Sequence, residues 1–147
     1  MPLTVKRIVL WRAEVDNKPG TLACTLEPLA KAGADLRLGM GYRHPVSEGK
    51  AAIEIYPIAG RKLSAAAQTA GLSRSAIPAL LVEGANQPGL GHAVASAVAA
   101  AGVNLTFFVA QVVGKVCSAV MGFETEADAK TAASAIKKAL APKKRPH

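Results

Sequence analysis

The chain has 147 residues, half of them apolar and only 4% aromatic, and it carries a formal net charge of +8. No run approaches the roughly 18 apolar residues that a membrane span needs, and the N-terminus lacks the long apolar region of a signal peptide, so we expect a cytoplasmic protein without a membrane partner.

The last eleven residues hold five of the 18 cations and no acid, which leaves 13 cations against 10 acids elsewhere. We interpret 142–147 as a solubilising basic tail rather than a nucleic-acid site, because the body has no basic stripe with interleaved aromatic residues.

One segment of the chain occurs twice. Aligning Pro19 with Pro88 superimposes 14–36 on 83–105 without gaps, and eight of the 23 aligned pairs are identical. Each copy places Asn-x-Pro-Gly between an apolar run and a run with helical spacing. A tandem repeat of about half the chain explains this most simply, and we predict a first domain over 1–74, a second over 75–141 and the tail beyond them.

Hydrophobic periodicity predicts the same order of elements in both copies. For the first copy we predict strands over 8–15, 36–43 and 51–58 and helices over 19–32 and 61–72. For the second we predict a strand over 77–84, a hairpin of 103–113 and 115–123 turned near Gly114, and helices over 87–102 and 125–140, with Thr125 as the last N-cap. The predicted fold class is α+β: two ferredoxin-like βαββα(β) units in tandem, each an antiparallel sheet with both helices on one face.

The predicted sheet faces that point away from the helices differ between the copies. Alternation assigns Arg37, Arg43 and Glu54 to this face in the first copy, and Phe108, Ala110 and Val112 in the second. The apolar face of the second copy suggests packing against the other copy or another chain, because a unit of about 70 residues buries barely enough surface to be stable alone.

The Asn-x-Pro-Gly turn has a structural and a functional interpretation. Asp16 or Asn17 can cap the helix, and Pro19 suits its first position. Gly20 leaves backbone N–H groups uncovered, and such a helix N-terminus favours a carboxylate or phosphate. Plain helix capping explains the same residues without a ligand.

The two segments that contain these turns resemble a known family. VDNKPGTLACTLEPLAKAGADL is similar to the opening of an ACT domain, and ANQPGLGHAVASAVAAAGVNL is similar to a second, more divergent one. The resemblance implies a regulatory module that binds a small molecule, usually an amino acid, at an interface between two units. It therefore also implies a homodimer, unless the two copies pair internally.

The resemblance carries over a set of ligand-binding positions at the first strand-to-helix turn of each copy. They are Asp16, Asn17, Pro19, Gly20, Thr21 and Leu22 in the first copy and Asn86, Gln87, Gly89 and Leu90 in the second. The second copy has Ala85 in place of Asp16 and Gly91 in place of Leu22. We therefore expect the first copy to be the better binding site.

The sequence has no pattern that indicates catalysis, a metal site or a cofactor site. The three histidines have no second ligand at helical spacing, although His92 could touch a ligand, and Cys24 and Cys117 are predicted to be two buried free thiols. Our first hypothesis is a non-catalytic, amino-acid-binding sensor or regulatory protein. The alternative is a ligand-free interaction module whose sheet face and basic tail dock a protein or nucleic-acid partner. An enzyme is the least favoured interpretation.

Overall fold

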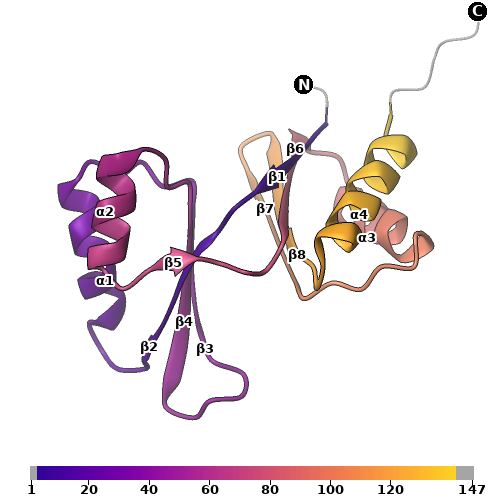
Figure 1. Ribbon diagram of the computed structural model, residues 1–147. Helices are drawn as coiled ribbons and strands as arrows, with labels where there is room; N and C mark the ends of the chain where they lie inside the picture. The colour runs from indigo at the N-terminus through magenta and orange to yellow at the C-terminus, as the bar shows by residue number, and fades with distance from the viewer. Residues whose placement is uncertain (1–2, 142–147) are drawn as a thin grey trace, which may run out of the picture. The chain divides into compact units, whose positions relative to one another are not determined.

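The computed structural model describes residues 3–141, which form two compact units (Figure 1). Val9–Ala76 is one unit, and residues up to Ile8 join those from Ile77 onward in the other. We call Val9–Ala76 the inserted unit, and 3–8 with 77–141 the split unit. The expected boundary after residue 74 lies close to the return of the chain to the split unit, but the expected first domain of 1–74 takes in a strand that belongs to the split unit. The expected tail over 142–147 lies outside the described residues.

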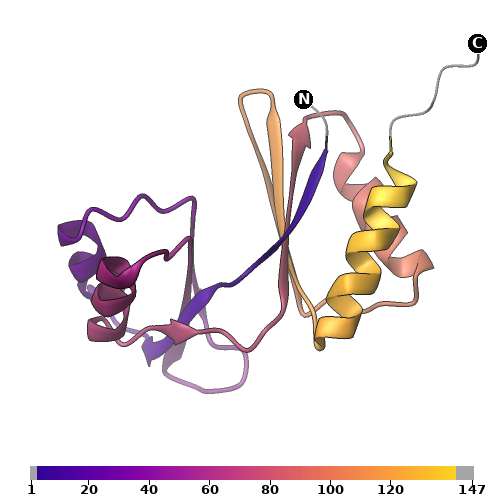
Figure 2. The same ribbon diagram turned by 45° about the horizontal axis from the view of Figure 1, so that its top comes forward.

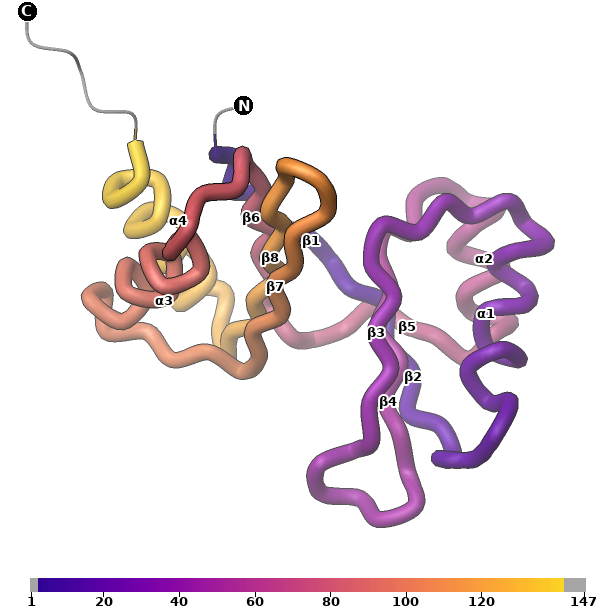
Figure 3. The backbone as a smooth tube through the Cα atoms, turned by 180° about the vertical axis from the view of Figure 1, so that it is seen from behind, coloured from indigo at the N-terminus to yellow at the C-terminus, as the bar shows by residue number. Residues whose placement is uncertain are grey.

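The inserted unit is a four-stranded antiparallel sheet with two helices. Its strands are β2 (Trp11–Asp16), β3 (Leu38–Arg43), β4 (Lys50–Tyr56) and β5 (Ser73–Arg74), in the order β3-β4-β2-β5, and its helices are α1 (Thr21–Lys31) and α2 (Arg61–Thr69). The β3–β4 hairpin and the two helices can be followed in Figure 3. Side chains of both layers, such as Trp11, Leu29, Ile55 and Ala67, form one buried core.

The split unit repeats this arrangement. Its strands are β1 (Thr4–Ile8), β6 (Ala79–Ala85), β7 (Phe107–Val113) and β8 (Val116–Gly122), in the order β1-β6-β8-β7. Helices α3 (Leu90–Ala100) and α4 (Glu126–Ala139) lie on one face of this sheet (Figure 2). Leu80, Met121, Phe123 and Ile136 are among the fully buried core residues. In each sheet a short strand pairs with the first strand of the repeat: β5 with β2, and β1 with β6. The predicted fold class, two ferredoxin-like units in tandem, is confirmed.

One predicted strand is in fact two. The run over 8–15 was expected to be continuous, but β1 ends at Ile8 and β2 begins at Trp11. Ile8 is 3% exposed and Leu10 is fully buried, so the run is apolar throughout although its two ends belong to different sheets. Periodicity alone shows an uninterrupted apolar strand here, because it carries no information about which sheet each residue joins.

Strand pairing also corrects the predicted sheet faces. Gly41 pairs with Ile53 and Gly39 with Ile55, and both isoleucines are in the core beneath the helices. Because directly paired residues share a face, the glycines of β3, with Arg43, lie on the helix side, and Glu54 lies on the other side. The same rule places Phe108, Ala110 and Val112 on the helix side of the split unit, since their partners include the core residues Ala119 and Met121. No helix among residues 3–141 is long and apolar enough to cross a membrane.

Candidate ligand site at the first strand-to-helix turn

Helix α1 begins without a side-chain cap. Its N-cap residue is Gly20, with φ 88°, and no side chain bonds to the first turn. The predicted capping by Asp16 or Asn17 is therefore wrong, and Pro19 precedes the cap instead of occupying the first helical position. The left-handed conformation of Gly20 suits glycine, which has no Cβ atom to clash there. The N–H of Thr21 donates to the carbonyl of Lys18 at 3.4 Å, so the first-turn N–H groups left for a ligand are those of Leu22 and Ala23.

A pocket of about 280 Å³ lies beside this helix start. One wall comes from the turn and α1, and the other comes from the β3–β4 hairpin. The lining residues are Val15, Asp16, Asn17, Lys18, Thr21, Leu22, Gly41, Tyr42, Arg43, Ala51, Ala52 and Ile53. Gly41 has no side chain to fill the pocket. A Cβ atom built on it would lie 3.9 Å from Cδ2 of Leu22 on the opposite wall. The size suits a ligand of amino-acid dimensions, since it lies just below the roughly 300–1,000 Å³ of drug-sized pockets.

The pocket contains part of the predicted site. Four of the predicted positions of the first copy line it: Asp16, Asn17, Thr21 and Leu22. Pro19 and Gly20 shape the turn without lining the pocket. The predicted residues of the second copy, Asn86, Gln87, Gly89 and Leu90, lie at the corresponding turn of the split unit, before and at the start of α3.

Sequence reasoning missed Lys18 and the whole hairpin wall. The signal was present in part, because the alternation of LRLGMGYR already places Gly41 and Arg43 on one face of a strand. It could not show that this face points toward α1, which the pairing of Gly41 with Ile53 establishes.

The polar groups around the pocket differ in whether they have a partner: Asp16 forms an ion pair, and the Thr21 hydroxyl has no hydrogen-bond partner within the described residues. Nζ of Lys50 donates to Oδ1 of Asp16 at 2.6 Å. This ion pair lowers the pKa of Asp16 and raises the pKa of Lys50. Oγ1 of Thr21 is buried and has no hydrogen-bond partner within the described residues. A polar atom in that state favours a bound group that can pair with it.

The split unit has the same turn backbone with different side chains. The N–H of Asn17 donates to the carbonyl of Gly49 at 2.9 Å, and the N–H of Asn86 donates to that of Lys115 at 2.8 Å. Gly89, like Gly20, is an N-cap in the left-handed region, with φ 84°. Both copies keep the asparagine and the Pro-Gly of the turn but differ at Asp16/Ala85 and Lys18/Gln87. We therefore interpret Pro-Gly as structural and look for a difference in binding chemistry in the charged side chains.

The side-chain differences remove every charge that the first copy places at this turn. Asp16 stands opposite Lys50 in the β2–β4 register, and the corresponding pair in the β6–β8 register is Ala85 with Val116. Gly41 and Arg43 of β3 correspond to Ala110 and Val112 of β7. The split unit thus has no charged group at the positions equivalent to Asp16, Lys50 and Arg43.

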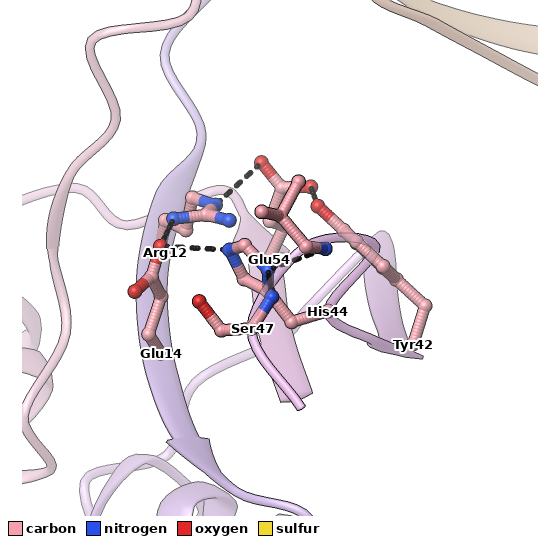
Figure 4. A network of polar contacts seen from close by, with 7 residues as sticks. Arg12, Glu14, Tyr42, His44, Ser47 and Glu54 are labelled. Atoms are coloured by element: carbon pink, nitrogen blue, oxygen red, sulfur yellow. Dashed lines mark hydrogen bonds and ion pairs between the residues drawn. The ribbon is translucent and has the colours of Figure 1, made fainter. Parts of the chain in front are cut away.

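The sheet face away from the helices carries a polar network (Figure 4). Oη of Tyr42 donates to Oε2 of the fully buried Glu54 at 3.0 Å, and Nε of Arg12 lies 3.8 Å from Oε1 of Glu54. Nη1 of Arg12 donates to Oε1 of Glu14 at 2.8 Å, and Nε2 of His44 lies 3.3 Å from the same oxygen. Burial raises the pKa of Glu54, and the hydrogen bond from Tyr42 and the charge of Arg12 oppose that rise. Tyr42 belongs both to this network and to the pocket lining.

The other candidate groups within the described part of the chain are two cysteines and His92. Cys117 is buried as predicted, but Cys24 is exposed, because it occupies the outer side of α1 rather than the side that faces the sheet. His92 is exposed, and its Nε2 lies 3.4 Å from Oγ of Ser96. Within residues 3–141 no group of three or more histidine, cysteine, aspartate or glutamate side chains could hold a metal ion.

The fold resembles those of several solved structures, among them regulatory subunits of aspartate kinase. The regulatory subunit of aspartate kinase from Thermus thermophilus matches with a TM-score of 0.63 at 15% identity, over 95% of this chain and 97% of that one. The corresponding subunit from Thermus flavus matches with a TM-score of 0.60 at 16% identity, over 95% and 97%. Protein BT0572 from Bacteroides thetaiotaomicron gives a TM-score of 0.71 at 16% identity, over 91% and 98%.

The chain has the tandem fold of these regulatory subunits. This confirms the resemblance to a tandem ACT-domain protein at the level of the fold, and the low identity limits the likeness to that level. No protein-family profile matches the chain, and no curated protein matches it in sequence.

Proposed function

We propose that this protein is a non-catalytic sensor or regulatory module that binds a small, amino-acid-type ligand in the pocket of the inserted unit. The ligand carboxylate lies against the open N-terminus of α1 and the Thr21 hydroxyl, and its ammonium lies against Asn17 or the free oxygen of Asp16. The observation that carries the proposal is the difference between the copies. The turn backbone is the same in both, but charged side chains and an unpartnered buried hydroxyl surround it in the inserted unit.

The experiment is a ligand screen with a variant that fills the pocket. Thermal unfolding of the full chain is measured with each standard amino acid, and a ligand that binds the folded state raises the melting temperature. Gly41→Val adds a side chain toward Leu22, which is 47% exposed and can move aside. We expect this variant to fold and to lose the ligand-induced shift.

Gly39→Val is the matched control for the screen. Gly39 lies on the same face of the same strand, a Cβ atom there meets nothing within 4 Å, and the residue does not line the pocket. This variant should keep the shift. If no amino acid stabilises the wild-type chain, or if both variants respond alike, ligand binding in this pocket is wrong.

We also propose that the chain is a homodimer through β7, an edge strand without charged residues. Four of its large apolar side chains are exposed: Phe108 at 38%, Val109 at 37%, Val112 at 50% and Val113 at 69%. Antiparallel pairing with β7 of a second copy would pair the free backbone groups and bury these side chains, which an isolated apolar edge would otherwise leave open to aggregation.

Light scattering after size exclusion tests the dimer. Val109→Lys combined with Val113→Lys should give a monomer, because charged lysines on an edge strand oppose pairing. Val46→Lys is the control, since Val46 is 87% exposed and lies outside β7. A monomeric wild-type chain at high concentration would contradict the dimer. Dimerisation without any ligand response would favour the alternative function, a ligand-free interaction module.

A further inference from the structure

The charge balance of the pocket restricts the ligand further. Three charged residues line it: Asp16, Lys18 and Arg43. The Asp16 carboxylate is already held by Lys50 at 2.6 Å, so its charge is neutralised within the protein. Lys50 lies beside Asp16 in the β2–β4 register and does not itself line the pocket.

Lys18 and Arg43 are the unbalanced charges. Neither forms an ion pair with any of residues 3–141, although Lys18 adds a weaker attraction on Asp16. Both side chains belong to exposed residues, one on the turn before α1 and the other at the end of β3. They therefore stand on opposite walls of the pocket.

The neutral groups of the pocket do not supply a compensating negative charge. The lining also includes the apolar residues Val15, Leu22 and Ile53 and Thr21, whose hydroxyl is unpartnered. A bound cation would meet two like charges and only one neutralised carboxylate. A bound anion would meet hydrogen-bond donors and unpaired positive charge on both walls.

We infer that the ligand carries two carboxylates and is an acidic amino acid. One carboxylate lies at the start of α1, and the second lies between Lys18 and Arg43. This inference rests on the proposed function, because it assigns the ligand class of the same pocket. The split unit supports it by contrast, since the uncharged residues Ala85, Gln87 and Val112 occupy the positions of Asp16, Lys18 and Arg43.

Isothermal titration with isosteric pairs tests the ligand class. Glutamate is compared with glutamine, aspartate with asparagine, and lysine is the cationic probe. We expect at least one acid to bind about tenfold or more tightly than its amide, since a hydrogen bond to a charged group contributes more than a neutral one. The preference should weaken at high salt, because the cations are exposed.

Two substitutions locate the second carboxylate. Arg43→Gln should weaken binding of the preferred acid by about tenfold or more and bring its affinity close to that of the amide. Arg61→Gln is the control: Arg61 is an exposed arginine of the same unit, at the start of α2, and does not line the pocket. Arg43→Glu should reverse the preference and favour lysine, which a general loss of folding cannot do.

The outcomes separate this inference from the proposed function. If a neutral or cationic amino acid binds at least as tightly as the acids, the acidic class is wrong and the amino-acid site remains. If succinate or glutarate binds and no amino acid does, the dianionic pocket is supported and the amino-acid function is wrong. If nothing binds, both proposals are wrong.

Discussion

Glu54 is fully buried, and it is the one charged side chain among the described residues that is buried. Its Oε2 accepts from Tyr42, but its Oε1 has no hydrogen-bond partner, and Nε of Arg12 at 3.8 Å is too far for one. Burial dominates and raises the pKa of Glu54. The folded protein therefore holds a proton on this carboxyl at pH values where the unfolded chain has lost it.

We predict that Glu54→Gln changes the pH dependence of stability. A carboxyl with a raised folded-state pKa contributes stability that is present below its unfolded pKa, near 4.5, and is lost as the pH rises through the folded value. Glutamine cannot ionise, so the variant should gain stability relative to wild type as the pH rises from about 4 to 7. The gain should be about 1.4 kcal/mol for each pH unit that separates the folded from the unfolded pKa of Glu54.

The sole tryptophan, Trp11, gives the readout for this prediction. It is 7% exposed in the core of the inserted unit, so its fluorescence during urea unfolding reports on the unit that contains Glu54. Arg61→Gln, at the start of α2 and not part of the network, should leave the pH profile unchanged. Parallel profiles for wild type and Glu54→Gln would mean that this carboxyl does not titrate differently on folding.

Among the four helices within residues 3–141, Thr125 is the one N-cap whose side chain accepts a hydrogen bond, from the N–H of Asp128 at 3.0 Å. This confirms the sequence prediction. We expect Thr125→Ala to destabilise the split unit by about 1 kcal/mol, as the loss of an N-cap side chain does elsewhere. Ser134→Ala, at an exposed position inside the same helix, should not lower the thermal midpoint followed by circular dichroism, because alanine has the higher helix propensity. Equal losses in both would contradict a capping role.

At the scale of elements, the first residue of β7, Phe107, lies opposite the last residue of β8, Gly122. They pair directly, and a Cβ atom on Gly122 would lie 2.3 Å from the Phe107 ring and 3.0 Å from Ile77. We predict that Gly122→Ala destabilises the split unit by about 1–3 kcal/mol, because the added methyl group overpacks a filled site. The measurement is the urea midpoint followed by circular dichroism.

Gly91→Ala in the same unit should have the opposite sign. A Cβ atom on Gly91 meets nothing within 4 Å, and the residue lies in helix α3, where alanine is favoured over glycine by up to about 1 kcal/mol. If Gly122→Ala were neutral or stabilising, as Gly91→Ala is expected to be, the close approach of Phe107 to Gly122 would not affect the stability of the split unit.

The long elements could be predicted from sequence, because each has a clear period and clear ends. Helix α4 was predicted at 125–140 and is found at Glu126–Ala139, and the strand predicted at 36–43 is found at Leu38–Arg43. The two-residue strand β5 and the separate strand β1 could not be predicted, because a short or continuous apolar run does not show which sheet it joins. The hairpin wall of the pocket could not be predicted for the same reason. Arg43 lines the same pocket as the turn before α1 because β3 pairs with β4 and β4 pairs with β2.

At the scale of the whole molecule, the inserted unit interrupts the split unit after its first strand. The inserted unit has a complete four-stranded sheet, both helices and its own core within Val9–Ala76. The split unit needs β1, which pairs with β6 from Thr4 opposite Glu83 to Ile8 opposite Ala79. Leu3 and Val5 also pack against its core.

We therefore predict that the two units differ as isolated fragments. A fragment of 9–76 should fold cooperatively by Trp11 fluorescence and keep the ligand response of the full chain. A fragment of 77–147 should be poorly folded, because it lacks the strand that covers the β6 edge and part of the core.

Appending 1–8 to the C-terminus of the 77–147 fragment through a flexible glycine-serine linker restores the missing strand and should restore a cooperative transition. The same fragment with Val5→Asp in the appended strand is the control, since a charge at that core position should prevent the rescue. Cooperative folding of 77–147 alone would show that β1 is dispensable, and the division of the chain into an inserted and a split unit would then describe geometry without energetic consequence.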